Sequence, residues 1–256
     1  MKYDLKDMTF LIPVRLDSIV RLENLLLTVE LIESNFETNI TILEADRYNN
    51  GLIEKLCYYT KYEFVEDKDM VFHRTKHINR MALASETPYL AIWDTDVIMQ
   101  PSQIMAAIEK LREGYEIAFP YDGDFLDISF IIRDLYVKNP EMEILVRNKD
   151  KMLFLYGKEM KGGAIMVNKD AYIKSGMDNE RYYGWGPEDF ERYERWKVLE
   201  YRIFRSEGYL FHLSHGRGSN SRFRSMEQMT ATNSELLKTR MSSKEELLKT
   251  KNTGKL

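Results

Sequence analysis

Short apolar runs alternate with amphipathic stretches from residue 9 to residue 112, and this rhythm is the strongest constraint on the fold. The apolar runs predict strands at residues 9–14, 39–43, 62–65 and 89–93. The amphipathic stretches between and after them predict helices at residues 17–32, 51–60, 76–85 and 102–112. Alternating strands and helices predict an α/β fold, a Rossmann-like and mostly parallel central sheet flanked by helices.

Beyond residue 120 the rhythm is less regular. Further elements are expected as a helix at 127–138, a strand at 162–167 after a Gly pair, and a helix at 190–198. From Ser225 the chain is polar, and a capping box at Ser242 to Glu245 predicts a C-terminal helical tail. The expected division is a domain at 1–222, with halves at about 1–120 and 121–222, followed by the tail at 223–256.

Composition excludes several classes of protein. A net charge of -4 in 256 residues argues against a nucleic-acid partner. Cys57 is the lone cysteine, so neither a disulfide framework nor a Cys-rich zinc site is expected. The charged start of the sequence lacks a secretory signal, and no apolar run is long enough for a transmembrane segment. We therefore predict a cytoplasmic protein, with peripheral contact at the inner face of a membrane through the tail as an alternative to a simple solvated helix.

Asp94-Thr95-Asp96 follows the apolar run Tyr89 to Trp93. Adjacent carboxylates repel each other, and ligands of parallel sheets gather at the carboxyl ends of strands, so this placement predicts a site for a divalent cation and a diphosphate. A solvated loop is the alternative. Neither a Gly-x-Gly-x-x-Gly loop nor a Gly-Lys-Ser/Thr phosphate loop occurs.

The run Tyr183 to Asp189 contains two glycines and a proline around Trp185, followed by Glu188 and Asp189. A Trp braced by glycines offers a flat apolar surface for a sugar ring, and a neighbouring carboxylate can accept a hydroxyl proton. Acidic residues also stabilise the first turn of a helix, so helix capping is the alternative interpretation.

His212 and His215 lie three residues apart at the end of another apolar run, with Arg217 following. Such histidines are either hydrogen-bonded structural groups or metal ligands. Combined with the aspartates they would form a mixed carboxylate and imidazole site, which suits Mn²⁺ better than Ca²⁺, with Mg²⁺ as the alternative. Glu44 and Asp46, at the end of the second strand, either bind uracil or ribose hydroxyls or belong to an ordinary polar loop.

Several segments together resemble the β-1,4-galactosyltransferase family of GT-A glycosyltransferases, in a bacterial-type form. The family's Pro-Phe-Arg-x-Arg, Phe-Asn-Arg-Ala-Lys and Asp-Val-Asp resemble the segments beginning at Pro13, Phe72 and Asp94. Its Gly-Gly-Val, Trp-Gly-Trp-Gly-Gly-Glu-Asp-Asp and Met-x-x-His-x-Arg are similar to the segments 162–164, 183–190 and 212–217. The departures are Asp17 for the second Arg, His212 for Met, Pro187 for Gly and Phe190 for Asp.

The resemblance implies a role for each matching residue. Asp189 would be the catalytic base. The donor would contact Pro13, Arg15, Phe72, Arg74, Lys76 and Asp94. Acceptor or donor sugar would contact Gly163, Trp185 and Glu188, and the metal would be bound by Asp96, His212 and His215.

The predicted function is metal-dependent, inverting transfer of a hexose, galactose or an N-acetylhexosamine, from a UDP-sugar to a hydroxyl of a glycan or lipid-linked saccharide in surface polysaccharide synthesis. An Asp-x-Asp after a strand also serves phosphohydrolases with an Asp nucleophile, which is one alternative. A carbohydrate-binding protein without turnover is the other.

Overall fold

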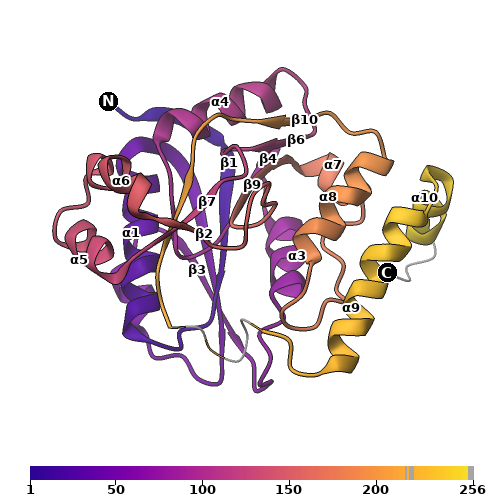
Figure 1. Cartoon of the computed structure of the whole chain (residues 1–256), viewed down its shortest axis with the longest axis horizontal. Coiled ribbons are helices and arrows are strands. Elements are labelled where there is room, and N and C mark those ends of the chain that lie inside the picture. The colour runs from indigo at the N-terminus through magenta and orange to yellow at the C-terminus, as the bar shows by residue number, and fades with distance from the viewer. Residues whose placement is uncertain (217, 219–221, 253–256) are drawn as a thin grey trace.

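A computed structural model describes residues 1–216, 218 and 222–252 of the chain. Its centre is a seven-stranded sheet in the order β10-β6-β9-β4-β1-β2-β3 (Figure 1). These strands are Ile203–Arg205, Ile117–Phe119, Ala164–Asn168, Tyr89–Trp93, Tyr3–Val14, Phe36–Asp46 and Lys61–Glu66. All neighbouring pairs are parallel except those of β9, which runs antiparallel to β4 and β6. The predicted mostly parallel α/β sheet is confirmed.

A second sheet of four strands has the order β5-β11-β7-β8. Its strands are Val97–Ile98, Leu210–Leu213, Phe125–Ile128 and Leu153–Phe154. Because β5 follows β4 after only three residues, the loop that contains Asp94 and Asp96 joins the two sheets.

The helices cover the sheets as amphipathic stretches should. Their bounds are α1 Ile19–Asn35, α2 Leu52–Leu56, α3 Arg74–Ala84, α4 Pro101–Arg112, α5 Phe130–Lys138, α6 Met142–Asn148, α7 Lys169–Lys174, α8 Glu188–Val198, α9 Met226–Met241 and α10 Lys244–Asn252. A 3-10 turn spans Lys149–Lys151. In Figure 1, α5 and α6 lie on the opposite side of the molecule from α8 and α9. No helix within the described residues is both long and apolar enough to cross a bilayer.

Local chemistry explains where the main helices begin. Ser18 caps α1 by accepting a hydrogen bond from the Arg21 backbone N–H, and Pro101 occupies the first turn of α4. The buried face of α1 carries the predicted Leu22, Leu25, Val29 and Ile32, whereas Leu26 is only half-buried. This face packs against the large core that continues through the central sheet.

Three predicted elements differ from the structure. The helix expected at 127–138 begins only at Phe130, because Ser129 caps it, and Asp127 belongs to strand β7. The helix expected at 51–60 is limited to Leu52–Leu56. The capping box lies one residue later than predicted, between Ser243 and Glu246, because Ser242 ends α9.

The tail begins as a packed element rather than as a separate one. Helix α9 lies along α8, and Thr239 of α9 donates a hydrogen bond of 2.8 Å to the buried Glu191 of α8. Thr232 is also buried in this contact. Part of the region 223–256 therefore belongs to the wall around α8.

Candidate active site

A cavity of about 530 Å³ opens where β1, the β4–β5 loop, β11 and the start of α8 meet. Twelve of the residues predicted from the sequence line it. They are Pro13, Arg15, Phe72, Arg74, Asp94, Asp96, Gly163, Trp185, Glu188, Asp189, His212 and His215. The fold thus brings together side chains separated by up to 202 residues in the chain, from Pro13 to His215.

Three predicted donor residues lie elsewhere in the described structure. Lys76 is exposed on α3, away from the cavity lining. Glu44 is buried and accepts a hydrogen bond of 2.6 Å from the Tyr62 hydroxyl. Asp46 accepts from the backbone N–H of Arg47. Nucleotide binding by these three residues has no support in the geometry, because each is turned to solvent or engaged in the local structure.

Asp96, His212 and His215 form one cluster, and their ligand atoms all lie within 4.8 Å of one another. The fold explains this placement, since β11 runs antiparallel to β5 and the Leu213 N–H donates to the Asp96 carbonyl at 2.8 Å. Asp96 Oδ2 lies 3.0 Å from His215 Nε2, and Asp96 Oδ1 lies 3.9 Å from His212 Nε2.

The electrostatics of this cluster fit a divalent cation. Burial of Asp96 opposes its ionisation, but His212, His215 and Arg21 outweigh that effect and lower its pKa to about 2. A carboxylate held ionised at 6% exposure, with two imidazole nitrogens facing it, is a donor set typical of Mn²⁺ or a similar metal. The resemblance assigned these three residues to the metal, and the geometry supports that assignment.

Asp127 is a site residue that the sequence did not reveal. His212 Nδ1 lies 2.7 Å from Asp127 Oδ1, and Ser214 Oγ also donates to this oxygen at 3.0 Å. Because a carboxylate can only accept, Nδ1 donates this hydrogen bond, and Nε2, which faces Asp96, is the ring nitrogen available to a metal. Asp127 therefore fixes the orientation of the His212 ring, as carboxylates do beside metal-binding histidines.

Asp94 does not belong to the metal cluster of the described residues. Arg74 donates to Asp94 Oδ1 from Nε at 3.2 Å and from Nη2 at 2.6 Å. Burial raises the pKa of Asp94, and Arg74 only partly offsets this rise. Arg74 Nη1 also lies 4.0 Å from Asp189 Oδ1, so one guanidinium joins the loop after β4 to the start of α8.

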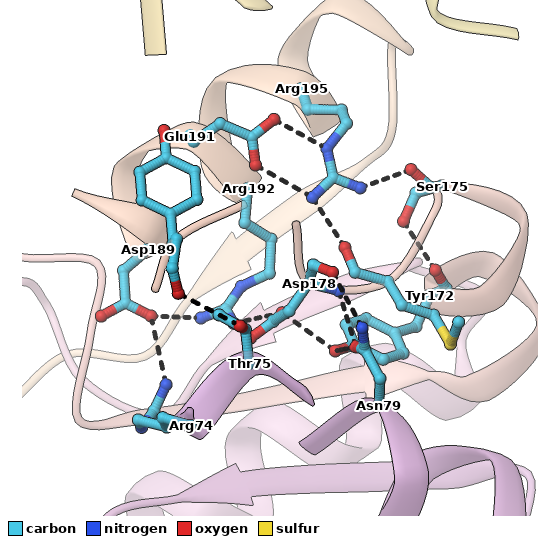
Figure 2. A network of polar contacts seen from close by, with 12 residues as sticks. Arg74, Thr75, Asn79, Tyr172, Ser175, Asp178, Asp189, Glu191, Arg192 and Arg195 are labelled. Atoms are coloured by element: carbon cyan, nitrogen blue, oxygen red, sulfur yellow. Dashed lines mark hydrogen bonds and ion pairs between the residues drawn. The ribbon is translucent and has the colours of Figure 1, made fainter. Parts of the chain in front are cut away.

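Asp189 is fixed by a buried network at the start of α8 (Figure 2). Arg192 Nη2 donates to Asp189 Oδ1 at 2.6 Å, and Arg192 Nη1 donates to Asp178 Oδ1 at 2.6 Å. The second oxygen, Oδ2, faces Gly162, where an added Cβ would lie only 2.4 Å away. The absence of a side chain at Gly162 leaves space for this carboxylate oxygen at the cavity wall.

Glu188 differs electrostatically from its neighbour Asp189. Burial, followed by the repulsion of Asp189, raises the pKa of Glu188 to about 8. Its Oε2 is buried and has no hydrogen-bond partner among the described residues. Glu188 is therefore a neutral acid near pH 7, whereas Asp189 pairs with Arg74 and Arg192.

Trp185 lies in a turn that the C-terminal segment supports. Gly184 adopts a φ of 86°, a left-handed conformation that favours glycine. Gln228 of α9 donates from Nε2 to the carbonyls of Tyr183 and Trp185 at 2.9 and 3.1 Å. The Phe223 ring packs edge-on against the Trp185 ring, with 4.7 Å between their centres. These contacts could not be predicted from the sequence, because the tail has the polar pattern of a solvated helix.

Arg15 and Phe72 line the cavity next to each other. The Arg15 guanidinium lies 5.5 Å from the Phe72 ring centre and donates to the Ala45 carbonyl and to Asp67 Oδ2 at 2.8 and 2.7 Å. Pro13 lines the same cavity, and Gly163 adopts a φ of 81° where its carbonyl accepts from the Asp94 N–H. Arg217 of the histidine segment lies outside the described residues.

The sheet order and this site define a GT-A fold, and the resemblance to galactosyltransferases is confirmed by comparison with known proteins. Residues 146–216 match the family model described as the N-terminal domain of galactosyltransferase. The β-1,4-galactosyltransferases 7 of Homo sapiens and Mus musculus are each 30% identical over 140 residues. That alignment covers 54% of this chain and 33% of each relative, so the chain matches about a third of their length.

Solved structures show the same fold. The catalytic domain of Drosophila β-1,4-galactosyltransferase 7, in complex with xylobiose, aligns with a TM-score of 0.56 at 15% identity, over 94% of this chain and 82% of that one. Glucosyl-3-phosphoglycerate synthase from Mycobacterium tuberculosis aligns with a TM-score of 0.52 at 11% identity, over 91% of this chain and 78% of that one. The chain therefore has the GT-A fold, and part of its sequence is similar to galactosyltransferases.

Substitution of Asp127 tests its role in orienting His212. We expect Asp127→Asn to weaken Mn²⁺ binding by about 10- to 100-fold, the usual effect of losing a carboxylate that orients a metal-bound His. Binding is measured by electron paramagnetic resonance of free Mn²⁺. Asp134→Asn, at an exposed carboxylate on α5, is the matched control. Equal affinities of the two variants would contradict this role.

The raised pKa of Glu188 predicts how stability depends on pH. Below about pH 4.5, Glu188 is protonated in both the folded and the unfolded protein. Between about pH 4.5 and pH 8, Glu188 retains its proton only in the folded protein. Its contribution to the free energy of unfolding should therefore fall as pH rises across this window. Urea unfolding of the metal-free protein at several pH values should show a smaller decline for Glu188→Gln than for the wild type. Glu194→Gln, on the same helix, is the control, and identical slopes in all three proteins would refute the assignment.

Proposed function

We propose that this protein is a metal-dependent, inverting glycosyltransferase that moves a hexose from a UDP-sugar to a hydroxyl of a glycan acceptor. One observation carries the proposal. A single cavity contains the cluster of Asp96, His212 and His215, the carboxylate of Asp189 and the Trp185 ring. A cation site, a proton acceptor and a sugar-packing surface are the three elements that this chemistry requires.

The relatives support this choice of substrates. A Drosophila β-1,4-galactosyltransferase 7 variant was solved with manganese, UDP-Gal and xylobiose, and it aligns with a TM-score of 0.53 at 16% identity. The mycobacterial synthase was solved with Mn²⁺, UDP-glucose and phosphoglyceric acid. We propose Mn²⁺ as the cofactor here, with Mg²⁺ as a substitute, and UDP-galactose or a UDP-N-acetylhexosamine as the donor.

On the donor side, Asp96, His212 and His215 would hold the metal. A divalent cation, when bound, neutralises the negative charge that develops on the departing diphosphate. The nucleotide would be bound by three residues that line the same cavity, Pro13, Arg15 and Phe72. Arg74 holds Asp94 at the cavity surface, where the carboxylate can accept hydrogen bonds from sugar or ribose hydroxyls.

On the acceptor side, Asp189 would act as the base. The acceptor oxygen bonds to the anomeric carbon while the bond from that carbon to the diphosphate oxygen breaks, and the hydroxyl proton passes to Asp189. Because the attack is a single displacement from the opposite face, the configuration inverts. Arg192 and Arg74 flank Asp189 with positive charge and hold its carboxyl group at the cavity wall.

Trp185, Glu188 and Gly163 would contact the acceptor sugar or the transferred sugar. A neutral Glu188 can donate a hydrogen bond to a sugar oxygen, which an ionised carboxylate cannot do. We propose a glycan or a lipid-linked saccharide of surface polysaccharide synthesis as the acceptor. The cytoplasmic location and the peripheral contact with a membrane stay predictions from the sequence.

The phosphohydrolase alternative requires Asp94 as a nucleophile. Its Oδ1 already accepts two hydrogen bonds from Arg74, and this alternative leaves the histidine pair and Trp185 without a role. Sugar transfer fits more of the cavity.

The direct test is turnover with UDP-sugars, Mn²⁺ and a panel of saccharide acceptors. We expect acceptor-dependent release of UDP that stops after chelation and returns when Mn²⁺ is added. Release of inorganic phosphate without an acceptor would support the hydrolase instead. Saccharide binding without release of UDP from any of the UDP-sugars would identify a binding protein. Sugar transfer in the presence of chelator would refute the metal site.

Replacement of the proposed base gives a second prediction. Asp189→Asn should lower the transfer rate by roughly 10²-fold or more, because removal of a general base has effects of this size. Binding of UDP with Mn²⁺, measured by calorimetry, should change little. Glu194→Gln on the same helix serves as the control, and an unchanged rate in Asp189→Asn would disprove the assignment.

A further inference from the structure

We infer that Arg21 of α1 binds the diphosphate of the nucleotide-sugar beside the metal site, in place of a cation at position 17. This inference rests on the proposed function and assigns a diphosphate contact to a residue outside the motifs that carry the resemblance. Position 17, where the resembling family has an Arg, carries a carboxylate in this chain. The charge at this position is therefore negative instead of positive, so a cation that pairs with the diphosphate must come from another residue.

The Arg21 side chain reaches the cavity from the first turn of α1. Asp17, four residues earlier, holds it through hydrogen bonds from Arg21 Nε to Oδ1 at 2.9 Å and from Nη2 to Oδ2 at 3.2 Å. Both residues line the cavity. Asp17 therefore no longer acts as a free anion but fixes the direction of the guanidinium.

The far end of Arg21 lies next to the metal cluster. Its Nη1 is 3.7 Å from Asp96 Oδ2, and its Nη2 is 3.4 Å from His215 Nδ1. The separation of 3.7 Å is too long for a hydrogen bond, and Nη1 makes none to any other described residue. A donor nitrogen of Arg21 thus lies at the cavity lining, beside the carboxylate that would bind the metal.

The other cavity arginines are committed to different partners. Arg15 donates from all three of its nitrogens to Ala45, Asp67 and Asp69. Arg74 donates to Asp94 from Nε and Nη2, and its remaining Nη1 has no hydrogen-bond partner among the described residues but lies 4.0 Å from Asp189 Oδ1, on the side of α8. Neither is paired with a metal-cluster residue in the described structure, whereas Arg21 is. The side chain of Arg21 is only 17% exposed, so its charge is weakly screened by solvent.

A simpler role for Arg21 would be to neutralise Asp96 alone. In that case the guanidinium and the metal would compete for the same carboxylate, and nucleotide affinity would depend on Arg21 only through metal affinity. The two roles predict different binding constants for Mn²⁺ and UDP, so they can be separated.

The test measures Mn²⁺ binding by electron paramagnetic resonance and UDP binding in saturating Mn²⁺ by calorimetry. The variants are Arg21→Met, which keeps an apolar stem, and Arg21→Lys, which keeps the charge without the planar fork. Arg112→Met removes an arginine that pairs with Asp7 away from the cavity and serves as the control. Thermal unfolding checks that each variant is folded.

We expect Arg21→Met to raise the UDP dissociation constant about tenfold or more, as expected for loss of a charged hydrogen bond, and Arg21→Lys to raise it less. Mn²⁺ alone should bind at least as tightly as to the wild type, since a positive charge near Asp96 has gone. The inference would be overturned if the UDP dissociation constant of Arg21→Met were within about twofold of the wild-type value. It would also be overturned if a loss of Mn²⁺ affinity accounted for the weaker UDP binding.

The same measurements separate this inference from the proposed function. Arg21-dependent UDP binding in a wild-type protein that transfers no sugar would keep the inference and refute the transferase. Sugar transfer with UDP affinity independent of Arg21 would keep the transferase and refute the inference. A wild-type protein that binds no UDP in the presence of Mn²⁺ would refute both.

Discussion

The buried guanidinium of Arg192 is the interaction on which the geometry of the site most depends. It is 1% exposed and bridges Asp178, in the segment after α7, and Asp189, in the first turn of α8 (Figure 2). Burial alone would raise the pKa of Asp178, but Arg192 reverses the effect and lowers it. Removing one partner of such a group leaves a buried charge unpaired, which is strongly destabilising. The position of the proposed base is therefore tied to the integrity of the surrounding core.

The network continues beyond Arg192 and connects α8 to the rest of the domain. Tyr172 donates to Asp178 Oδ1 at 2.9 Å, and Asn79 of α3 donates to the Asp178 carbonyl at 2.9 Å. On the opposite side, Arg74 at the start of α3 reaches both Asp94 and Asp189. Helix α3 thus contacts both the acidic loop and the start of α8, so the sides of the cavity that carry Asp94 and Asp189 share one support.

The sequence predicted most of the site because strand ends and turns carry recognisable chemistry. Asp96 follows an apolar run, Trp185 stands in a Gly- and Pro-rich turn, and Asp189 follows that turn in the first turn of a helix. Asp127 was missed because the residues after it have helical periodicity, which concealed the short strand β7. Gln228 was missed because a polar residue in a polar helix gives no sign of its partner. Lys76 matched a motif by position, yet the turn of α3 directs it to solvent.

The α/β alternation, the strand-end position of the aspartates and the Gly-rich turn at Trp185 can all be read from the amino-acid sequence, because they depend on local periodicity and backbone preference. The pairing of β11 with β5, which places His212 and His215 beside Asp96, is visible only in the folded chain. The folded chain alone also shows that Arg21 reaches the cluster and that Glu188 is neutral while Asp189 is ion-paired. These properties arise from burial and from distances between residues far apart in the chain, and neither quantity is encoded in local sequence pattern.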